Sequence, residues 1–224
     1  QMEEAIESLV TSTVTKLLEE AGFKQPPVNP LLIGAHHGIY FMVRPLPEAN
    51  VEYKTIRHEE SWVVTLNGEP PPDSQTVAAA RAISSILINI PEDLNEVREE
   101  IIERGAEEIL MPKSWFEESI KSFGYDVPEL KRRFGVTYEV VAARTLQFRR
   151  SFLTIFDDQM VVKRMASKGL DISAEPSLAE KEILQRALES STYQRASDSN
   201  ALIECHPLPL ESGIQRVFCF KVPK

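Results

Sequence analysis

The chain has 224 residues, of which 42% are hydrophobic and 26% are charged, proportions that suit a globular protein able to bury a core as one large domain or two small ones. Its formal net charge of −9 argues against nucleic-acid binding by the molecule as a whole, though not by a local basic patch. The glutamate-rich start is not a signal peptide, and no apolar run approaches the ~20 residues that span a bilayer, so we expect a cytoplasmic protein with no membrane partner.

The first part of the chain predicts a helix, a small sheet and a second helix. Apolar side chains recur at helical spacing over residues 2–21, and a stiff connector, PPVNP, follows at 26–30. Strands are expected at 39–44 and 59–66, the second ending at an Asn-Gly turn. Three prolines then precede a helix expected at 75–89.

An acidic amphipathic helix is expected next, over residues 99–110. It ends before Pro112, because proline lacks a backbone N–H and clashes with the preceding turn. A new helix is expected to open at Ser114, whose hydroxyl would cap it, with Glu117 completing a capping box. On spacing alone, this is a joint between two helices.

A helix-turn-helix pattern follows over residues 126–150, which hold six basic and three acidic side chains. A unit of this kind reads DNA from the start of its second helix and holds the phosphates with basic side chains. Glu139 lies on that face and repels phosphate, so we favour packing or protein contact and keep DNA as the alternative. The nucleic-acid contacts expected under that alternative are Lys131, Arg132, Arg133 and Tyr138.

The last part of the chain, 151–224, predicts a small α+β unit. Strands are expected at 152–156, 160–164, 202–206 and 214–222, and Ser177 with Glu180 forms a capping box that opens a helix to about Ser190. Cys205 and Cys219 stand in apolar, strand-like surroundings without the spacing of a metal site. We expect two buried free thiols, since cytosolic thiols stay reduced, with a disulfide as the alternative.

The run from Gly105 to Pro112 (GAEEILMP) resembles the FAAELLMP joint of the ImmA/IrrE family of metallopeptidase-like regulators. The N-terminal helix, the PPVNP connector, the strand that ends at Asn67 and the FGVT turn after Phe134 occur in the same order as in that family. The resemblance implies an α+β fold: a zincin-like helical domain with a small twisted β-sheet over 1–125, a helix-turn-helix-like segment over 126–150, and a small α+β C-terminal unit, possibly GAF-like, over 151–224.

The helix at 75–89 lacks the HExxH zinc motif that the family carries there. HExxH places two histidines on one helical face to hold zinc, beside a glutamate that polarises the bound water. The resemblance places Arg81 at the first histidine, Ala82 at the glutamate and Ser85 at the second histidine. Arg81 cannot ligate a cation, because its guanidinium stays protonated and offers only donors. Ala82 has no base, and Ser85 is a poor ligand.

The family's third zinc ligand, a glutamate, has its counterpart in Glu99 or Glu100. A relocated zinc site would need ligands from separate elements, and the chain offers only four histidines for it: His36, His37, His58 and His206. We therefore expect no catalytic residues, no metal and no cofactor, and treat Arg81, Ala82, Ser85, Glu99 and Glu100 as vestigial active-site positions.

The resemblance implies a regulatory role, typically the control of a repressor under stress. We expect a catalytically inactive metallopeptidase-like regulator that binds a protein partner, such as a transcriptional repressor or a stress-response regulator. We also expect Arg81 to pair with Glu99, Glu100 or Glu103, because one guanidinium relieves the repulsion among carboxylates that have lost a metal. The alternatives are a DNA-binding regulator that uses the basic segment and a zinc peptidase with relocated ligands.

Overall fold

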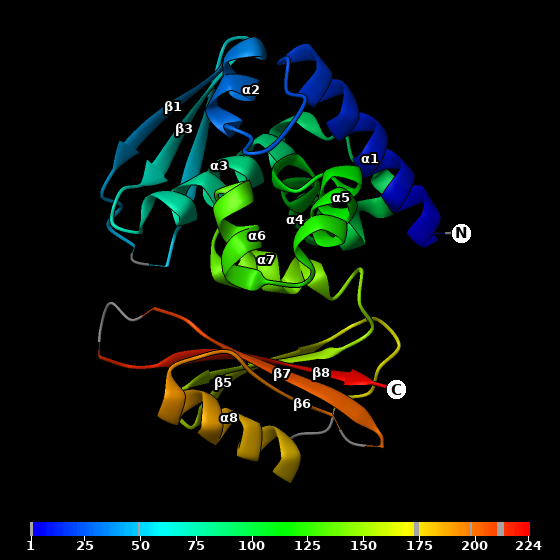
Figure 1. The fold of residues 1–224 in the computed structure, drawn as a ribbon. Helices are drawn as coiled ribbons and strands as arrows, with labels where there is room; N and C mark the ends of the chain where they lie inside the picture. Colours follow the sequence, from blue (N-terminus) through cyan, green and yellow to red (C-terminus); the bar gives the residue numbers. More distant parts are fainter. Residues whose placement is uncertain (1, 49, 173–174, 198, 210–212) are drawn as a thin grey trace. The chain divides into compact units, whose positions relative to one another are not determined.

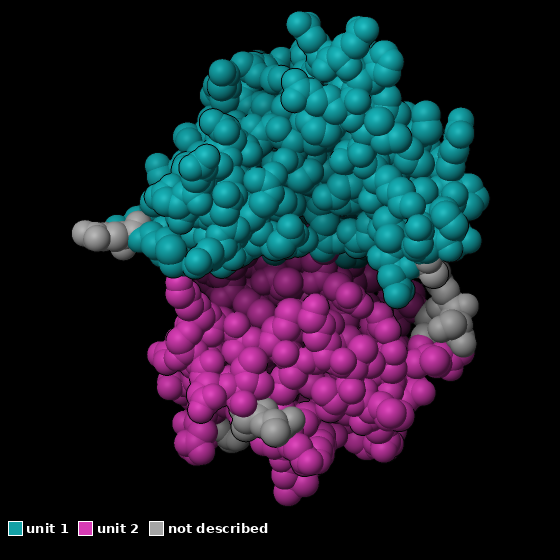
Figure 2. Space-filling model, turned by 180° about the vertical axis from the view of Figure 1, so that it is seen from behind, with its two compact units in different colours: residues 1–137 teal, residues 138–224 magenta. Residues whose placement is uncertain are grey.

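The computed structural model describes residues 2–48, 50–172, 175–197, 199–209 and 213–224 (Figure 1). It is an α+β protein with two separate β-sheets. The chain divides into two compact units, residues 1–137 and residues 138–224, which Figure 2 colours separately. The division falls inside the segment predicted as a helix-turn-helix, so its first helix belongs to one unit and its second to the other. Among the described residues, none of the helices is long and apolar enough to cross a membrane.

The first unit combines six α-helices and one 3-10 helix with a three-stranded sheet, as far as its described residues show. In the sheet, β3 lies between β1, to which it is parallel, and β2, to which it is antiparallel. The elements are α1 (Met2–Glu20), α2 (Pro30–His36), β1 (Ile39–Arg44), β2 (Tyr53–His58), β3 (Ser61–Asn67), α3 (Pro72–Leu87), η1 (Glu92–Val97), α4 (Arg98–Leu110), α5 (Lys113–Phe123) and α6 (Val127–Phe134).

Most elements of the first unit lie where the sequence predicts them, but the short helix α2 and the 3-10 helix η1 were not expected. Strand β2 lies in the polar stretch between the two predicted strands, where the sequence indicates a hairpin or edge excursion and gives no strand bounds, because the β2 side chains are mostly exposed and carry no apolar alternation. Helix α5 begins at Lys113 with Pro112 as its N-cap residue and has no side-chain cap there. The prediction that Ser114 caps this helix is wrong. Instead, Glu108 of the preceding helix α4 accepts a hydrogen bond from the backbone N–H of Lys113 (2.9 Å).

Helix α3 is the central helix of the first unit, packed on the sheet, on α2 and on α4. Its alanine-rich side, Ala78 to Ala80 with Ala82 and Ile83, is buried. Helix α4 comes very close to it at Gly105, where an added Cβ would lie 2.2 Å from the Ser84 Oγ. That hydroxyl also donates to the Ile102 carbonyl (2.8 Å), so the glycine and the serine together bring the two helices together.

The second unit is an antiparallel five-stranded sheet in the order β5-β4-β8-β7-β6, with α8 packed on one of its faces (Figure 1). The capping box predicted at Ser177 and Glu180 is confirmed at the start of α8. The strand at 194–197 was not expected, because this polar stretch has no apolar pattern. The elements are α7 (Tyr138–Thr145), β4 (Phe152–Asp157), β5 (Met160–Ala166), α8 (Leu178–Ser190), β6 (Gln194–Ser197), β7 (Ala201–Pro207) and β8 (Arg216–Pro223).

The prediction of two free thiols is wrong, because Cys205 and Cys219 form a disulfide. They stand directly opposite each other on β7 and β8, with their Cα atoms 4.1 Å apart. Side chains that face each other in an antiparallel pair point to the same side of the sheet, and the two sulfurs meet there. Both cysteines are buried in the core beneath α8.

Candidate functional site

The exposed side of α3 carries the positions where the sequence analysis placed a lost metal motif. Arg81 and Ser85 are four residues apart, so they lie on one helical face, one above the other. Both are half-buried, whereas Ala82 between them is fully buried. The face therefore offers a guanidinium and a hydroxyl, and Ala82 points into the core.

Arg81 joins two carboxylates that belong to different elements. Its Nη1 donates to Glu52, which immediately precedes β2 (2.6 Å), and its Nε contacts Glu103 on α4 (2.9 Å). Burial disfavours the charged guanidinium, but the hydrogen bond with Glu52 and the charge of Glu103 outweigh it and raise the pKa of Arg81. The expected ion pair of Arg81 with one of the α4 glutamates is confirmed for Glu103, and Glu52 is a partner that was not expected.

Asn67 at the end of β3 holds the chain that carries Glu52. Its side-chain amide donates to the Val51 carbonyl (3.3 Å), and its backbone N–H donates to the Glu52 carbonyl (2.9 Å). Asn67 itself is buried, with 2% of its surface exposed. These two hydrogen bonds from a buried residue fix the course of the backbone before β2. That course places Glu52 beside Arg81.

The two candidate glutamates of α4 lie on different stripes of the helix. Glu100 pairs with Arg104 (2.6 Å), which also binds Glu3 of α1, so this stripe faces α1. Glu99 shares its stripe with Glu103, four residues on, which contacts Arg81. Of the two candidates, Glu99 is the one on the side of the helix that carries the Arg81 contact.

Tyr53, the first residue of β2, completes the cluster. Burial is the main cause that raises the pKa of its hydroxyl, which hydrogen-bonds Ser85; the negative charges of Glu99 and Glu52 add to the rise. Arg81 on α3 thus binds Glu52 and Glu103, with Tyr53 and Ser85 hydrogen-bonded to each other and Glu99 close enough to act on the Tyr53 hydroxyl. We call these six residues the Arg81 cluster.

The Arg81 cluster does not fit a zinc ion. Zinc needs neutral or anionic donors, and the first-histidine position instead holds a cation that two carboxylates already bind. Among the described residues, no group of three or more histidine, cysteine, aspartate or glutamate side chains is placed to hold a metal. The histidines named for a relocated site belong to different elements: His36 ends α2 and His37 follows it, His58 ends β2, and His206 lies on β7 of the second unit.

The basic side chains predicted to contact DNA have partners inside the protein. Lys131 pairs with Asp73 of α3 (3.1 Å), Arg132 pairs with Glu129 one turn earlier, and the Arg133 Nε donates to the Ser119 Oγ (2.7 Å). In the second unit, the Tyr138 ring lies edge-on to the Phe218 ring, 6.4 Å between centroids. The Lys131 and Arg133 contacts join α6 to other helices, whereas the Arg132 pair lies within α6 and leaves the Arg132 side chain 75% exposed.

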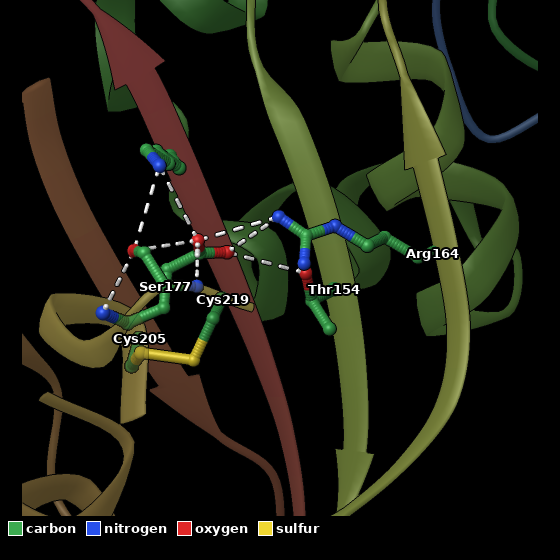
Figure 3. Close-up of polar contacts among 7 residues, drawn as sticks. Thr154, Arg164, Ser177, Cys205 and Cys219 are labelled. Carbon is green, nitrogen blue, oxygen red and sulfur yellow. Dashed lines mark hydrogen bonds and ion pairs between the residues drawn. A yellow bond between two sulfur atoms is a disulfide. The ribbon is translucent and has the colours of Figure 1, made fainter. Parts of the chain in front are cut away.

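A buried charged cluster of the second unit is centred on Glu180 of α8, and Figure 3 shows Thr154, Arg164 and Ser177 among the residues that form it. The carboxylate, 1% exposed, accepts from the Arg164 Nη2 of β5 (3.1 Å) and from the backbone N–H of Ser177 (2.9 Å). Thr154 of β4 (3.4 Å) and Lys221 of β8 (3.5 Å) lie at the edge of hydrogen-bond range. The cluster ties the start of α8 to three strands, and among the described residues no hydrogen-bond partner reaches the buried Nε and Nη1 of Arg164.

Comparison with known proteins identifies the first unit more closely. A peptidase M78 family model, described as the IrrE N-terminal-like domain, matches residues 35–146, half of the chain. Among solved structures, a Mycobacterium tuberculosis transcriptional regulator has a similar fold, with a TM-score of 0.66 and 13% sequence identity over 97% of this chain and 76% of that one. At this identity the likeness shows the fold alone. No curated protein matches the chain.

Proposed function

The chain belongs to the family of the IrrE N-terminal-like domain, and we propose that it is a regulatory member that binds a protein partner instead of hydrolysing one. The observation that carries the proposal is the engagement of Arg81 by Glu52 and Glu103, at the position that the resemblance matches to the family's first metal ligand. Arg81 offers only donors and Ala82 has no titratable group, so these two positions supply neither a metal ligand nor a general base. The similar fold of a transcriptional regulator supports a regulatory role, and a transcriptional repressor or stress-response regulator is the partner class that we propose.

Absence of hydrolysis is tested with the purified chain, excess zinc and an unstructured protein substrate such as casein. We expect no cleavage above that of a heat-denatured sample. Glu99→Gln is the matched variant, because it removes the carboxylate that a zinc enzyme would need. Cleavage that requires zinc and disappears in Glu99→Gln would overturn the proposal.

Partner binding is tested by placing a photo-crosslinking residue at Ser85, in the Arg81 cluster, and at exposed Lys16 on α1 as the control. We expect the Ser85 variant to capture a regulatory protein in the source cells and the Lys16 variant not to. The captured protein is then purified and its affinity is measured by calorimetry. Equal capture at both positions, or no binding by the purified proteins, would contradict partner binding at this face.

We keep a cytoplasmic location as part of the proposal, and the Cys205–Cys219 disulfide is the observation that argues against it, since such bonds are rare in reducing compartments. The number of free thiols in protein that was alkylated inside the source cells distinguishes a reducing compartment from an oxidising one. We expect two free thiols in a cytoplasmic sample. A fully oxidised pair would favour an oxidising compartment.

The alternative of DNA binding predicts an affinity that falls steeply with salt. Lys131 and Arg133 have partners on other helices, and Glu129 neutralises the exposed Arg132, so we expect no retention of the chain on heparin at low salt. Retention that is lost in Arg132→Gln would reinstate this alternative.

A further inference from the structure

We propose that the free edge of β1 binds an extended segment of a partner protein, one that alternates apolar side chains and carries a carboxylate beside Arg44. Such a segment would add a fourth strand to the sheet of the first unit, as peptides do when they pair with an exposed sheet edge. This edge lies on the opposite side of the sheet from β2, whose first residue belongs to the Arg81 cluster. The inference therefore goes beyond the proposed function, and the two can fail separately.

The first step concerns the backbone of β1. This strand lies at the border of the sheet, with β3 on one side of it (Figure 1). The Arg44 carbonyl accepts a hydrogen bond from the N–H of Gly68, which directly follows β3 (3.0 Å). Because successive residues of a strand direct their backbone groups to opposite sides, Phe41 and Val43 direct theirs away from β3. These N–H and C=O groups are a template for an added strand.

The second step compares the two edges of the same sheet. Charged side chains on an edge strand oppose pairing with another chain. Strand β2 carries three basic side chains, Lys54, Arg57 and His58. Strand β1 carries one charged residue, Arg44, at its end, and its register with β3 runs without a shift over all six residues. Tyr40 and Val43 are 61% and 52% exposed. The β1 edge is therefore regular, apolar and accessible, as a strand-binding surface requires.

The third step concerns an apolar pocket beside this edge. It has a volume of about 300 Å³, and Val43, Leu31 of α2 and Leu66 of β3 are among the residues that line it. Residues opposite each other in paired strands place their side chains on the same face, so a partner residue next to Val43 points toward the pocket. The volume is at the lower end for a ligand pocket and suits one apolar side chain. Neighbouring partner residues then lie over the other face, beside Tyr40 and Met42.

The fourth step concerns charge and selects the occupant. The chain has 34 acidic residues, yet none lies in the stretch 21–47, which contains α2 and β1. Arg44 is exposed, and within the described part of the chain no carboxylate pairs with it. A carboxylate of the partner beside Arg44 would form a charge-assisted hydrogen bond and set the register of pairing. A second copy paired β1 to β1 supplies no such carboxylate, because its edge comes from the same acid-free stretch.

The proposal is tested by selecting a phage-displayed library of random linear peptides on the full chain and titrating the enriched peptides by calorimetry. We expect enriched peptides to have apolar side chains at every second position and one acidic residue. Val43→Pro removes an N–H that β3 does not use, a place where an edge strand tolerates proline. It should weaken peptide binding by about 10-fold or more, because main-chain pairing is lost.

Thr55→Pro is the matched control at the other edge. The Glu52 carbonyl accepts from the N–H of Asn67 at the end of β3, so Thr55, three residues on, directs its backbone groups away from β3. This variant introduces the same proline into an exposed edge strand and should leave peptide affinity unchanged. Thermal unfolding of both variants verifies that the sheet is retained.

A charge exchange tests the surface without a proline, so the proposal stays testable where Val43→Pro does not fold. Arg44→Glu should weaken binding of the acidic peptide by about 5-fold, because an exposed attraction becomes a repulsion. Replacing the acidic residue of the peptide with lysine should restore binding to the Arg44→Glu variant and weaken binding to the unaltered chain.

No enriched peptide, equal losses in Val43→Pro and Thr55→Pro, or no restoration by the lysine peptide would overturn the proposal. A dimer of the unaltered chain that dissociates in Val43→Pro during sedimentation would place a second copy on this edge and would overturn the choice of occupant. These results leave the proposed function standing, because that function is tested by crosslinking at Ser85 and by zinc-dependent cleavage.

Discussion

Glu180→Gln is a substitution for which the structure predicts a large loss of stability in the second unit. The carboxylate is 1% exposed and pairs with Arg164, whose side chain is 8% exposed. The variant keeps the shape of the side chain and removes its charge, leaving the guanidinium buried without a counter-ion. Lys221 is affected less, because it is 28% exposed and reaches water.

The magnitude follows from burial. Removing one partner of a buried ion pair costs about 3–5 kcal/mol, because the remaining charge stays desolvated. The amide oxygen of the substituted side chain can still accept a hydrogen bond from the Ser177 N–H, so the capping box is weakened and not abolished. We therefore expect the free energy of unfolding to fall by about 3 kcal/mol, at the lower end of that range. In a chain of this length that corresponds to a fall in Tm of roughly 6–12 °C.

The assay combines urea unfolding followed by circular dichroism with hydrogen exchange of the α8 amides. Glu182→Gln is the matched control, because Glu182 lies on the same helix and is exposed; its expected loss is within about 0.5 kcal/mol. The double variant Arg164→Met/Glu180→Leu removes both charges and should recover most of the stability, as replaced buried pairs do. Equal losses in Glu180→Gln and Glu182→Gln, with unchanged α8 exchange, would refute the reasoning.

Three further predictions concern other parts of the chain. Gly105→Ala should destabilise the first unit by about 1–3 kcal/mol, because its new Cβ meets the Ser84 Oγ at 2.2 Å; thermal unfolding measures this, and an unchanged Tm would contradict the close packing. Reduction of the Cys205–Cys219 bond, which closes a loop of 14 residues, should cost about 3 kcal/mol, and Cys219→Ala should match the reduced protein in urea unfolding. The pKa of Tyr193 is raised to about 12, first by burial and then by Glu204. Since the folded state holds this proton more tightly than the unfolded state, the free energy of unfolding should fall as the pH rises from about 10 to about 12. The Tyr193→Phe variant should lose less stability over the same pH range.

What the sequence determined by itself was local. The strand at 39–44, the helix that ends before Pro112 and the capping box at Ser177 depend on residues within about four positions of one another, where periodicity, proline and side-chain caps decide the outcome. The spacing of four residues within an expected helix also places Arg81 and Ser85 on one helical face. The family resemblance, stated on the GAEEILMP run and on the order of the elements around it, is confirmed.

Only the tertiary structure decided which distant groups meet. Glu52 lies 29 residues from Arg81, and no local sequence feature marks it as a partner of that arginine. The choice of Glu99 over Glu100 depends on which stripe of α4 faces α3. The cysteine pair followed from the register of β7 on β8, where Cys205 stands opposite Cys219; a shift by one residue would have sent the two side chains to opposite faces. Contacts of this kind arise from packing between elements, whose geometry short-range preferences do not contain.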